Sequence, residues 1–312
     1  MGRIIFLCPF AKTEISGGIK TAYRHAELLA EMGFDASVYQ PEGSPSWFET
    51  QAKLLTAANF TPTADDILVF PEAINGPLVD IAKARGPARK VLFCQAQYYA
   101  LFSAIPAENY RDLGFDRVLC QSKIAKGFLE RVLGLNDISV IPCFIDADLF
   151  FPRGNAMQIA LIPRKLPREA AAIHSVFGLK YRELKSVPWQ IIESRSERET
   201  AEIFGRSAIV LSLPFLESFG LVPLEAMASG AIVVGFHGYG ALEYATDENG
   251  FWFASDHIEE TADAIADVLK GIERGDPAIQ KMRETAAATA AAYSKRRTRD
   301  ALRQFYGGLL SN

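Results

Sequence analysis

The chain has 312 residues, of which 49% are hydrophobic and 22% charged, as in a globular protein with room for two hydrophobic cores. A formal net charge of −4 and a pI near 5.7 argue against nucleic-acid binding, which needs a basic surface. The sequence contains no run of about 18 apolar residues, so we expect no membrane span. The opening MGRIIFLCPF indicates a first strand rather than a signal peptide, because it has no small-residue cleavage site.

Short apolar runs rich in β-branched residues alternate with amphipathic helical patterns, which indicates mostly parallel sheets covered on both faces. In the first half we expect strands at RIIFLCPF, DASVYQP, DILVFPE, KVLFCQA, RVLCQS and ISVIPCF. One helix is expected from about residue 19 to 32, where Gly33 ends it, and another from about 123 to 132.

The pattern is interrupted at residues 148–154, by Pro152 and Gly154, and then begins again. Further strands are expected at QIALIPR, WQIIES, AIVLSLP, AIVVGF and GFWF. A capping box at Ser196 and Glu199 opens a helix between two of them. We therefore predict an α/β protein of two doubly wound domains, residues 1–150 and 151–290, with a ligand cleft at the carboxyl ends of the strands.

The last part of the chain, from residue 276, is predicted to be helical. Its apolar stripe and its basic cluster consist of Leu302, Phe305, Tyr306 and Leu309, and of Lys295, Arg296, Arg297, Arg299 and Arg303. The favoured interpretation is a helix packed on the body with a solvated basic face. The alternative is peripheral contact with anionic membrane lipids, worth about 1 kcal/mol for each basic residue near the surface.

The cysteines lie in or beside apolar runs, without a CxxC pair, and the four histidines show no zinc spacing. We expect reduced thiols in a cytoplasmic protein at Cys8, Cys94, Cys120 and Cys143. Asp146 and Asp148 form a DxD sequence, but it lies in the predicted linker and has no third ligand nearby. We therefore predict no metal site.

The segment PFLESFGLVPLEAMASG carries two carboxylates, Glu217 and Glu225, around an almost uncharged run. Burying an unpaired carboxylate costs several kcal/mol, so both acids either reach solvent or face hydroxyl donors. A short helix expected from about residue 221 to 229 puts Glu217 in the preceding loop, and its free N-terminal amides favour an anionic group. The alternative, a surface Glu217 and a Glu225 that caps its own helix, stays open.

Two other candidate sites follow predicted strands. Gly17 and Gly18 lead from the first strand into a helix, where bare amides can cradle a phosphate, although a plain strand-to-helix turn is the favoured explanation. Arg164 and Lys165 follow the first strand of the second half. A guanidinium fork and an ammonium group can hold a diphosphate; a pair of surface cations is the alternative.

Taken in order, the glycine loop, the crossover IPCFIDADLFFP, the Arg164–Lys165 pair and the segment 196–253 resemble the group-one, retaining glycosyltransferases of GT-B fold. Glu217 and Glu225 match that family's E-x7-E signature. The resemblance implies an acceptor-side first domain and a compact second domain that binds a nucleotide-sugar. Residues 291–312 look like the family's terminal helix, which crosses back to the first domain.

The resemblance also implies a nucleotide-diphosphate-sugar donor, a glycan or lipid-linked acceptor, and no metal or other cofactor. It implies a cytoplasmic enzyme, with the inner face of the membrane as a peripheral alternative. Catalytic roles would belong to Arg164, Lys165 and Glu217, and Glu225 would hold the ribose hydroxyls. The other donor contacts would come from Gly17, Gly18, Ser218, Phe219, Gly220 and Leu221.

Two features depart from the family. Its usual His after the fourth strand is absent, and Gln95, Gln97 and Tyr98 stand there as candidates for acceptor contacts. The loops 43–59 and 98–109 are further candidates for acceptor recognition. Between LIPRK and WQIIES there is room for one helix, where the family has an extra strand and helix. Two other functions therefore stay open: a nucleotide-sugar epimerase or hydrolase of the same fold, and a module that binds a nucleotide-sugar or glycan without turnover.

Overall fold

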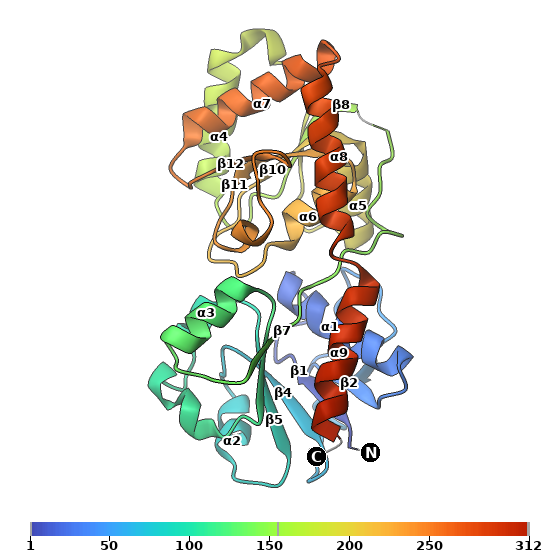
Figure 1. Cartoon of the computed structure of the whole chain (residues 1–312), viewed down its shortest axis with the longest axis vertical. Helices are drawn as coiled ribbons and strands as arrows, with labels where there is room; N and C mark the ends of the chain where they lie inside the picture. Colours follow the sequence, from blue (N-terminus) through green and yellow to red (C-terminus); the bar gives the residue numbers. More distant parts are fainter. Residues whose placement is uncertain (1, 155, 311–312) are drawn as a thin grey trace. The chain divides into compact units, whose positions relative to one another are not determined.

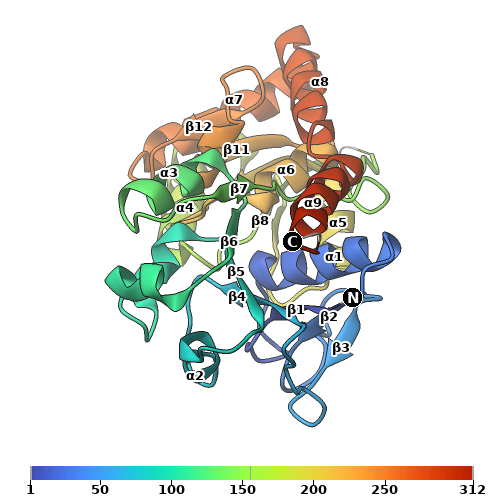
Figure 2. The same cartoon turned by 60° about the horizontal axis from the view of Figure 1, so that its bottom comes forward.

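The structure is a computed structural model that describes residues 2–154 and 156–310. It divides the chain into two compact units, Met1–Cys143 with Arg296–Asn312, and Phe144–Lys295. Figures 1 and 2 label the helices and strands of both. Each unit is a parallel sheet covered by helices, so the predicted pair of doubly wound α/β halves is confirmed.

The first unit is built on a seven-stranded parallel sheet in the order β3-β2-β1-β4-β5-β6-β7. Its strands are β1 (Ile4–Leu7), β2 (Ala36–Tyr39), β3 (Lys53–Leu55), β4 (Ile67–Pro71), β5 (Arg89–Cys94), β6 (Arg117–Cys120) and β7 (Ile138–Val140). The strand order reverses between β1 and β4. Ligands of open α/β sheets bind at the carboxyl ends of the strands at such a switch point.

Helices cover both faces of this sheet (Figure 1). They are α1 (Gly17–Glu31), α2 (Leu78–Lys83), α3 (Lys123–Arg131) and α9 (Lys295–Leu310), with the short η1 (Gln97–Phe102) and η2 (Ala107–Leu113). The Ser16 side chain caps α1 by accepting a hydrogen bond from the Gly18 amide (3.3 Å). On α9 the apolar stripe is buried at Leu302, Tyr306 and Leu309, which confirms the packed-helix interpretation.

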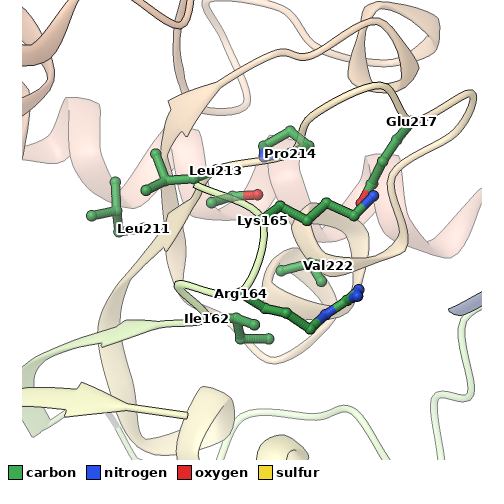
Figure 3. Close-up of a pocket in the computed structure, with 9 residues that line it drawn as sticks. Ile162, Arg164, Lys165, Leu211, Leu213, Pro214, Glu217 and Val222 are labelled. Atoms are coloured by element: carbon green, nitrogen blue, oxygen red, sulfur yellow. The ribbon is translucent and has the colours of Figure 1, made fainter. Parts of the chain in front are cut away.

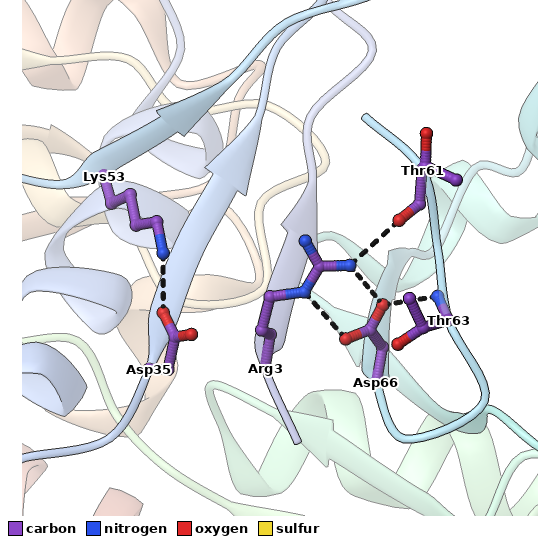
Figure 4. A network of polar contacts seen from close by, with 6 residues as sticks. All are labelled: Arg3, Asp35, Lys53, Thr61, Thr63 and Asp66. Carbon is purple, nitrogen blue, oxygen red and sulfur yellow. Dashed lines mark hydrogen bonds and ion pairs between the residues drawn. The ribbon is translucent and has the colours of Figure 1, made fainter. Parts of the chain in front are cut away.

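An ion pair with a buried carboxylate connects the start of β1 to the loop before β4 (Figure 4). The Arg3 guanidinium donates to both carboxylate oxygens of Asp66, at 2.9 and 2.7 Å, and to the Thr61 carbonyl. Burial would raise the pKa of Asp66, but hydrogen bonds from Arg3 and Thr63 outweigh it and hold that pKa below its ordinary value. The contribution of Asp66 to stability is therefore present above its unfolded pKa and is lost as the pH falls.

The second unit holds a five-stranded parallel sheet in the order β12-β11-β10-β8-β9. Its strands are β8 (Ala156–Leu161), β9 (Trp189–Ile191), β10 (Ser207–Ser212), β11 (Ile232–Phe236) and β12 (Phe251–Phe253). The helices are α4 (Pro167–Lys180), α5 (Glu197–Arg206), α6 (Leu221–Ala228), α7 (Ile258–Glu273) and α8 (Pro277–Ala291), with the short η3 (Arg182–Leu184) and η4 (Gly240–Glu243). Here the switch point lies between β8 and β10.

Several details differ from the sequence-based expectations. The units divide after Cys143, whereas we predicted a boundary at residue 150. Strand β3 was missed: it is a three-residue edge strand, too short for a periodic pattern, inside the segment 43–59 that we predicted as an acceptor loop. Between β8 and β9 the chain forms α4 and one short turn of 3-10 helix, in line with the room expected for a single helix.

The four cysteines are free and buried. Within residues 2–154 and 156–310, no helix combines the length and apolar character that a bilayer crossing needs. Membrane contact through the basic cluster of α9 stays a prediction.

Candidate functional site

The predicted cations and one of the predicted acids meet at the switch point of the second sheet (Figure 3). Arg164 and Lys165 follow β8, and Glu217 lies in the loop after β10. A hollow between these two strand ends is lined by Ile162, Arg164, Lys165, Leu211, Ser212, Leu213, Pro214, Glu217 and Val222. The strand order alone therefore explains why residues about fifty positions apart become neighbours.

Lys165 and Glu217 form an ion pair at the edge of this hollow. The Lys165 ammonium lies 2.6 Å from a Glu217 carboxylate oxygen and also donates to the Phe215 carbonyl at 3.3 Å. Both side chains are only about a fifth exposed, at 22% and 23%. Arg164 is exposed, and among the described residues it makes no hydrogen bond or ion pair. With two cations and one carboxylate, the hollow carries one positive charge in excess and has an unengaged guanidinium.

The loop after β10 turns into α6 through Gly220. This residue is the N-cap with φ 77° and ψ 87°, a left-handed conformation that glycine adopts without strain. Among the described residues, the N-terminus of α6 has no side-chain cap. The Tyr244 hydroxyl donates a hydrogen bond to the Gly220 carbonyl at 2.6 Å and so stabilises the turn. The start of α6, with Val222 in the lining, thus offers N–H groups to an anion.

Glu225 lies on α6, as predicted, and is 6% exposed. It is not among the residues that line the hollow. The structure therefore brings Arg164, Lys165 and Glu217 together and leaves the role predicted for Glu225 untested.

The residues between Glu217 and Glu225 also contribute to the packing of this loop. Ser218 and Phe219 are buried. The Phe219 ring packs edge-on against Tyr244 and Tyr293, with centroids 6.0 and 5.2 Å away. Gly240 lies so close to this loop that a Cβ there would be 2.5 Å from the Phe219 nitrogen. Sequence reasoning missed these supports, although the glycine-rich GYGALEY segment was a signal for a close backbone approach.

In the first unit, the structure brings the predicted glycine pair and one of the predicted glutamines together. Gly17 and Gly18 form the first turn of α1, and the Gln95 side chain lies beside them: a Cβ on Gly18 would be 3.5 Å from both Gln95 side-chain amide atoms. Gln97 is buried, at 1% exposure. Tyr98 packs against Phe128 of α3, with ring centroids 5.3 Å apart.

One residue at the same strand ends was not predicted. Glu72 directly follows β4 and is 6% exposed. The sequence did contain a signal, because Glu72 is the acid that ends the apolar run DILVFPE. We assigned the whole run to a strand and gave that acid no separate role.

Comparison with known proteins finds glycosyltransferases. The model of the family described as "Glycosyl transferases group 1" matches residues 187–287, which span β9 to most of α8 and include the Glu217 loop. The chain is also 26% identical, over 282 residues, to an alpha-1,6-glucosyltransferase of Actinobacillus pleuropneumoniae serotype 7 (strain AP76). That match covers 86% of this chain and 84% of the relative.

The chain is a glycosyltransferase, and its residues 187–287 match the group 1 family model. Solved structures support the GT-B fold of this glycosyltransferase over its full length. Sucrose-phosphate synthase of Thermosynechococcus elongatus superimposes with a TM-score of 0.74 at 12% identity, covering 100% of both chains. HepE of Anabaena, solved in complex with UDP-glucose, gives a TM-score of 0.69 at 15% identity and covers 99% of both. Identities this low relate the folds alone.

Proposed function

We propose that this glycosyltransferase transfers a hexose from a UDP-sugar to a hydroxyl group of a glycan or lipid-linked acceptor, with retention of configuration and without a metal ion. The observation that carries the proposal is the hollow at the switch point of the second sheet, where Arg164, Lys165 and Glu217 meet. UDP-glucose is the first donor to test, because HepE was solved with it and the relative is named a glucosyltransferase.

The chemistry explains why the hollow needs cations. When the bond between the anomeric carbon and the diphosphate breaks, negative charge develops on the departing diphosphate. Arg164, Lys165 and the first amides of α6 can stabilise that charge by fixed electrostatic interactions. Two cations and a helix N-terminus supply what a divalent cation supplies in other phosphate sites, which supports a reaction without metal.

Glu217 has a second use in this proposal. Its carboxylate holds Lys165 at 2.6 Å and so keeps the ammonium in the hollow before the donor arrives. The same carboxylate can accept hydrogen bonds from hydroxyls of the transferred sugar. We keep Glu225 as the ribose contact, and Gly17 and Gly18 as phosphate contacts, on the strength of the family motif.

A direct experiment follows UDP release from UDP-glucose, with and without added D-glucose as acceptor, in buffer containing EDTA. We expect acceptor-dependent release and a product whose anomeric proton signal in NMR is that of an α-glucoside, as in the donor. Release that ignores the acceptor would indicate a hydrolase, conversion of the donor sugar an epimerase, and binding without any turnover a binding module. Loss of activity in EDTA that Mg²⁺ restores would contradict the metal-free reaction.

A further inference from the structure

Glu72 is a buried carboxylate at the switch point of the first sheet, between the ends of β1 and β4. One of its oxygens accepts a hydrogen bond from the Gln95 backbone amide at 3.1 Å, and the other from the Ala96 amide at 2.9 Å. Its own carbonyl accepts a hydrogen bond from the Tyr110 hydroxyl. Among the described residues it has no cationic partner. Two loop amides thus support a charge that is costly to bury.

Those amides belong to the segment that carries the candidate acceptor residues. The Gln95 side-chain oxygen accepts a hydrogen bond from Gln121 at 2.8 Å, so this row of polar groups extends from β4 across β5 to β6. Two residues further on, Gln97 is 1% exposed, and its side-chain oxygen has no partner within the described part of the chain. The Gln97 oxygen therefore has an acceptor position that a hydroxyl donor can fill.

Titratable groups reach Glu72 from three neighbouring elements: Cys8 after β1, Cys94 in β5 and Tyr110 in η2. Burial raises the pKa of Cys8 to about 12 and raises the pKa of Cys94 and of Tyr110 above their ordinary values, so all three stay neutral near pH 7. Burial also raises the pKa of Glu72 to about 7, although its own backbone amide and the amides of Gln95 and Ala96 oppose this. Glu72 is therefore the group of this cluster that changes charge near neutral pH.

We propose that Glu72 is a positioning residue for the acceptor: its ionised carboxylate holds the backbone of Gln95 and Ala96 and thereby sets the glutamine side chains that bind an acceptor hydroxyl. The proposal rests on the transferase function proposed above. A protonated Glu72 turns one oxygen into a hydroxyl, which is a poorer partner for an amide N–H, and the segment loses one of its two anchors. Acceptor affinity therefore falls as the pH drops through about 7.

The variant Glu72→Gln tests this, because a carboxamide has one acceptor oxygen at every pH. With UDP-glucose as donor and D-glucose as acceptor, we expect its KM for D-glucose at pH 8 to rise about tenfold or more, with a smaller change in kcat. At pH 5.5 the wild type loses the same anchor, so the two KM values should converge. Glu72→Asp keeps a charge but is one methylene shorter, so it should keep the pH dependence at a higher KM.

The matched control is Glu108→Gln, which removes the charge of an exposed acid on η2 and should behave as wild type throughout. A ratio of KM values, Glu72→Gln over wild type, that stays constant from pH 5.5 to 8 would overturn the proposal, because it would reduce Glu72 to a packing role.

Backbone hydrogen exchange at Gln95 and Ala96 needs neither donor nor acceptor and separates this proposal from the transferase function. After correction for the intrinsic pH dependence, we expect the wild type to be better protected at pH 8 than at pH 5.5, and Glu72→Gln to show the lower protection at both. Equal protection of both proteins at pH 8 contradicts the positioning role. Protection as expected, with no transfer by the wild type, would instead contradict the proposed function.

Discussion

The switch points of the two sheets have the same topological origin and opposite chemistry. In the second unit the strand ends carry two cations and a paired, partly exposed acid around a hollow. In the first unit they carry glutamines and a buried acid without a cationic partner among the described residues. Cations suit a diphosphate, and neutral amides suit sugar hydroxyls. We therefore expect the two sheets to provide different binding surfaces through the residues that follow their strands.

The largest expected effect comes from removing a cation at the second switch point. We predict that Lys165→Ala lowers kcat for transfer from UDP-glucose by about 100- to 1,000-fold, as the loss of one preorganised electrostatic contact does. Its melting temperature should hardly change, because a partly exposed ion pair contributes about 1 kcal/mol or less.

The control for this substitution is Lys180→Ala. Lys180 also pairs with an acid in the same unit, at 2.7 Å from Glu259, but lies on α4 outside the hollow. Its kcat should equal that of the wild type. An equal loss of kcat in both variants would contradict a catalytic role for the cation in the hollow.

A second prediction compares two ion pairs of the first unit, one with a buried acid and one exposed, by their contributions to stability. Arg3→Ala removes the guanidinium that pairs with Asp66, whose side chain is 1% exposed, and we expect it to lower the free energy of unfolding by about 3 kcal/mol. Lys53→Ala breaks the exposed pair with Asp35 shown in Figure 4 and should cost less than about 1 kcal/mol. Urea unfolding at pH 7 measures both. A similar loss of free energy of unfolding in both variants would contradict the claim that the buried Asp66 makes its ion pair the more stabilising one.

A third test concerns the packing that supports the Glu217 loop. Gly240→Ala would force a methyl group against the Phe219 backbone, and we expect a loss of about 1–3 kcal/mol of stability. Gly178→Ala is the matched control, because a Cβ at that helical position meets no atom within 4 Å and should stabilise α4 slightly. A Gly240→Ala protein as stable as wild type would show that the two loops do not depend on each other.

The smallest effect is expected at the first switch point. A Cβ on Gly18 would make only ordinary contacts, at 3.5 Å, so Gly18→Ala should change the free energy of unfolding by less than about 1 kcal/mol. Lower activity at unchanged stability would support the predicted phosphate contact. A strong loss of stability would instead show that this edge is as tightly packed as the Gly240 loop.

The fold was largely predictable because its central strands, such as β1, β4 and β10, are buried on both faces and form continuous apolar runs. Strand β3 was not predicted, because it has only three residues and Lys53 is exposed, so it forms no continuous apolar run. The capping box at Ser196 and Glu199 was readable because its bonds are local, and the structure contains both of them.

The site was predictable only in part. The Arg164–Lys165 pair and Glu217 were identified from motifs, but their meeting depends on strand order, which local sequence does not encode. Glu72 was not recognised, because the amides that bind its carboxylate lie 23 and 24 residues away in the chain. Residues that act through tertiary contacts leave almost no local pattern.

Isothermal titration of UDP and of uridine into the wild type and Arg164→Ala tests the central claim most directly. If the hollow of the second unit binds the diphosphate, the variant should bind UDP about 10- to 100-fold more weakly, the loss expected for a charge-assisted hydrogen bond. Uridine, which has no phosphate, should bind both proteins equally. An unchanged affinity of Arg164→Ala for UDP would contradict the account.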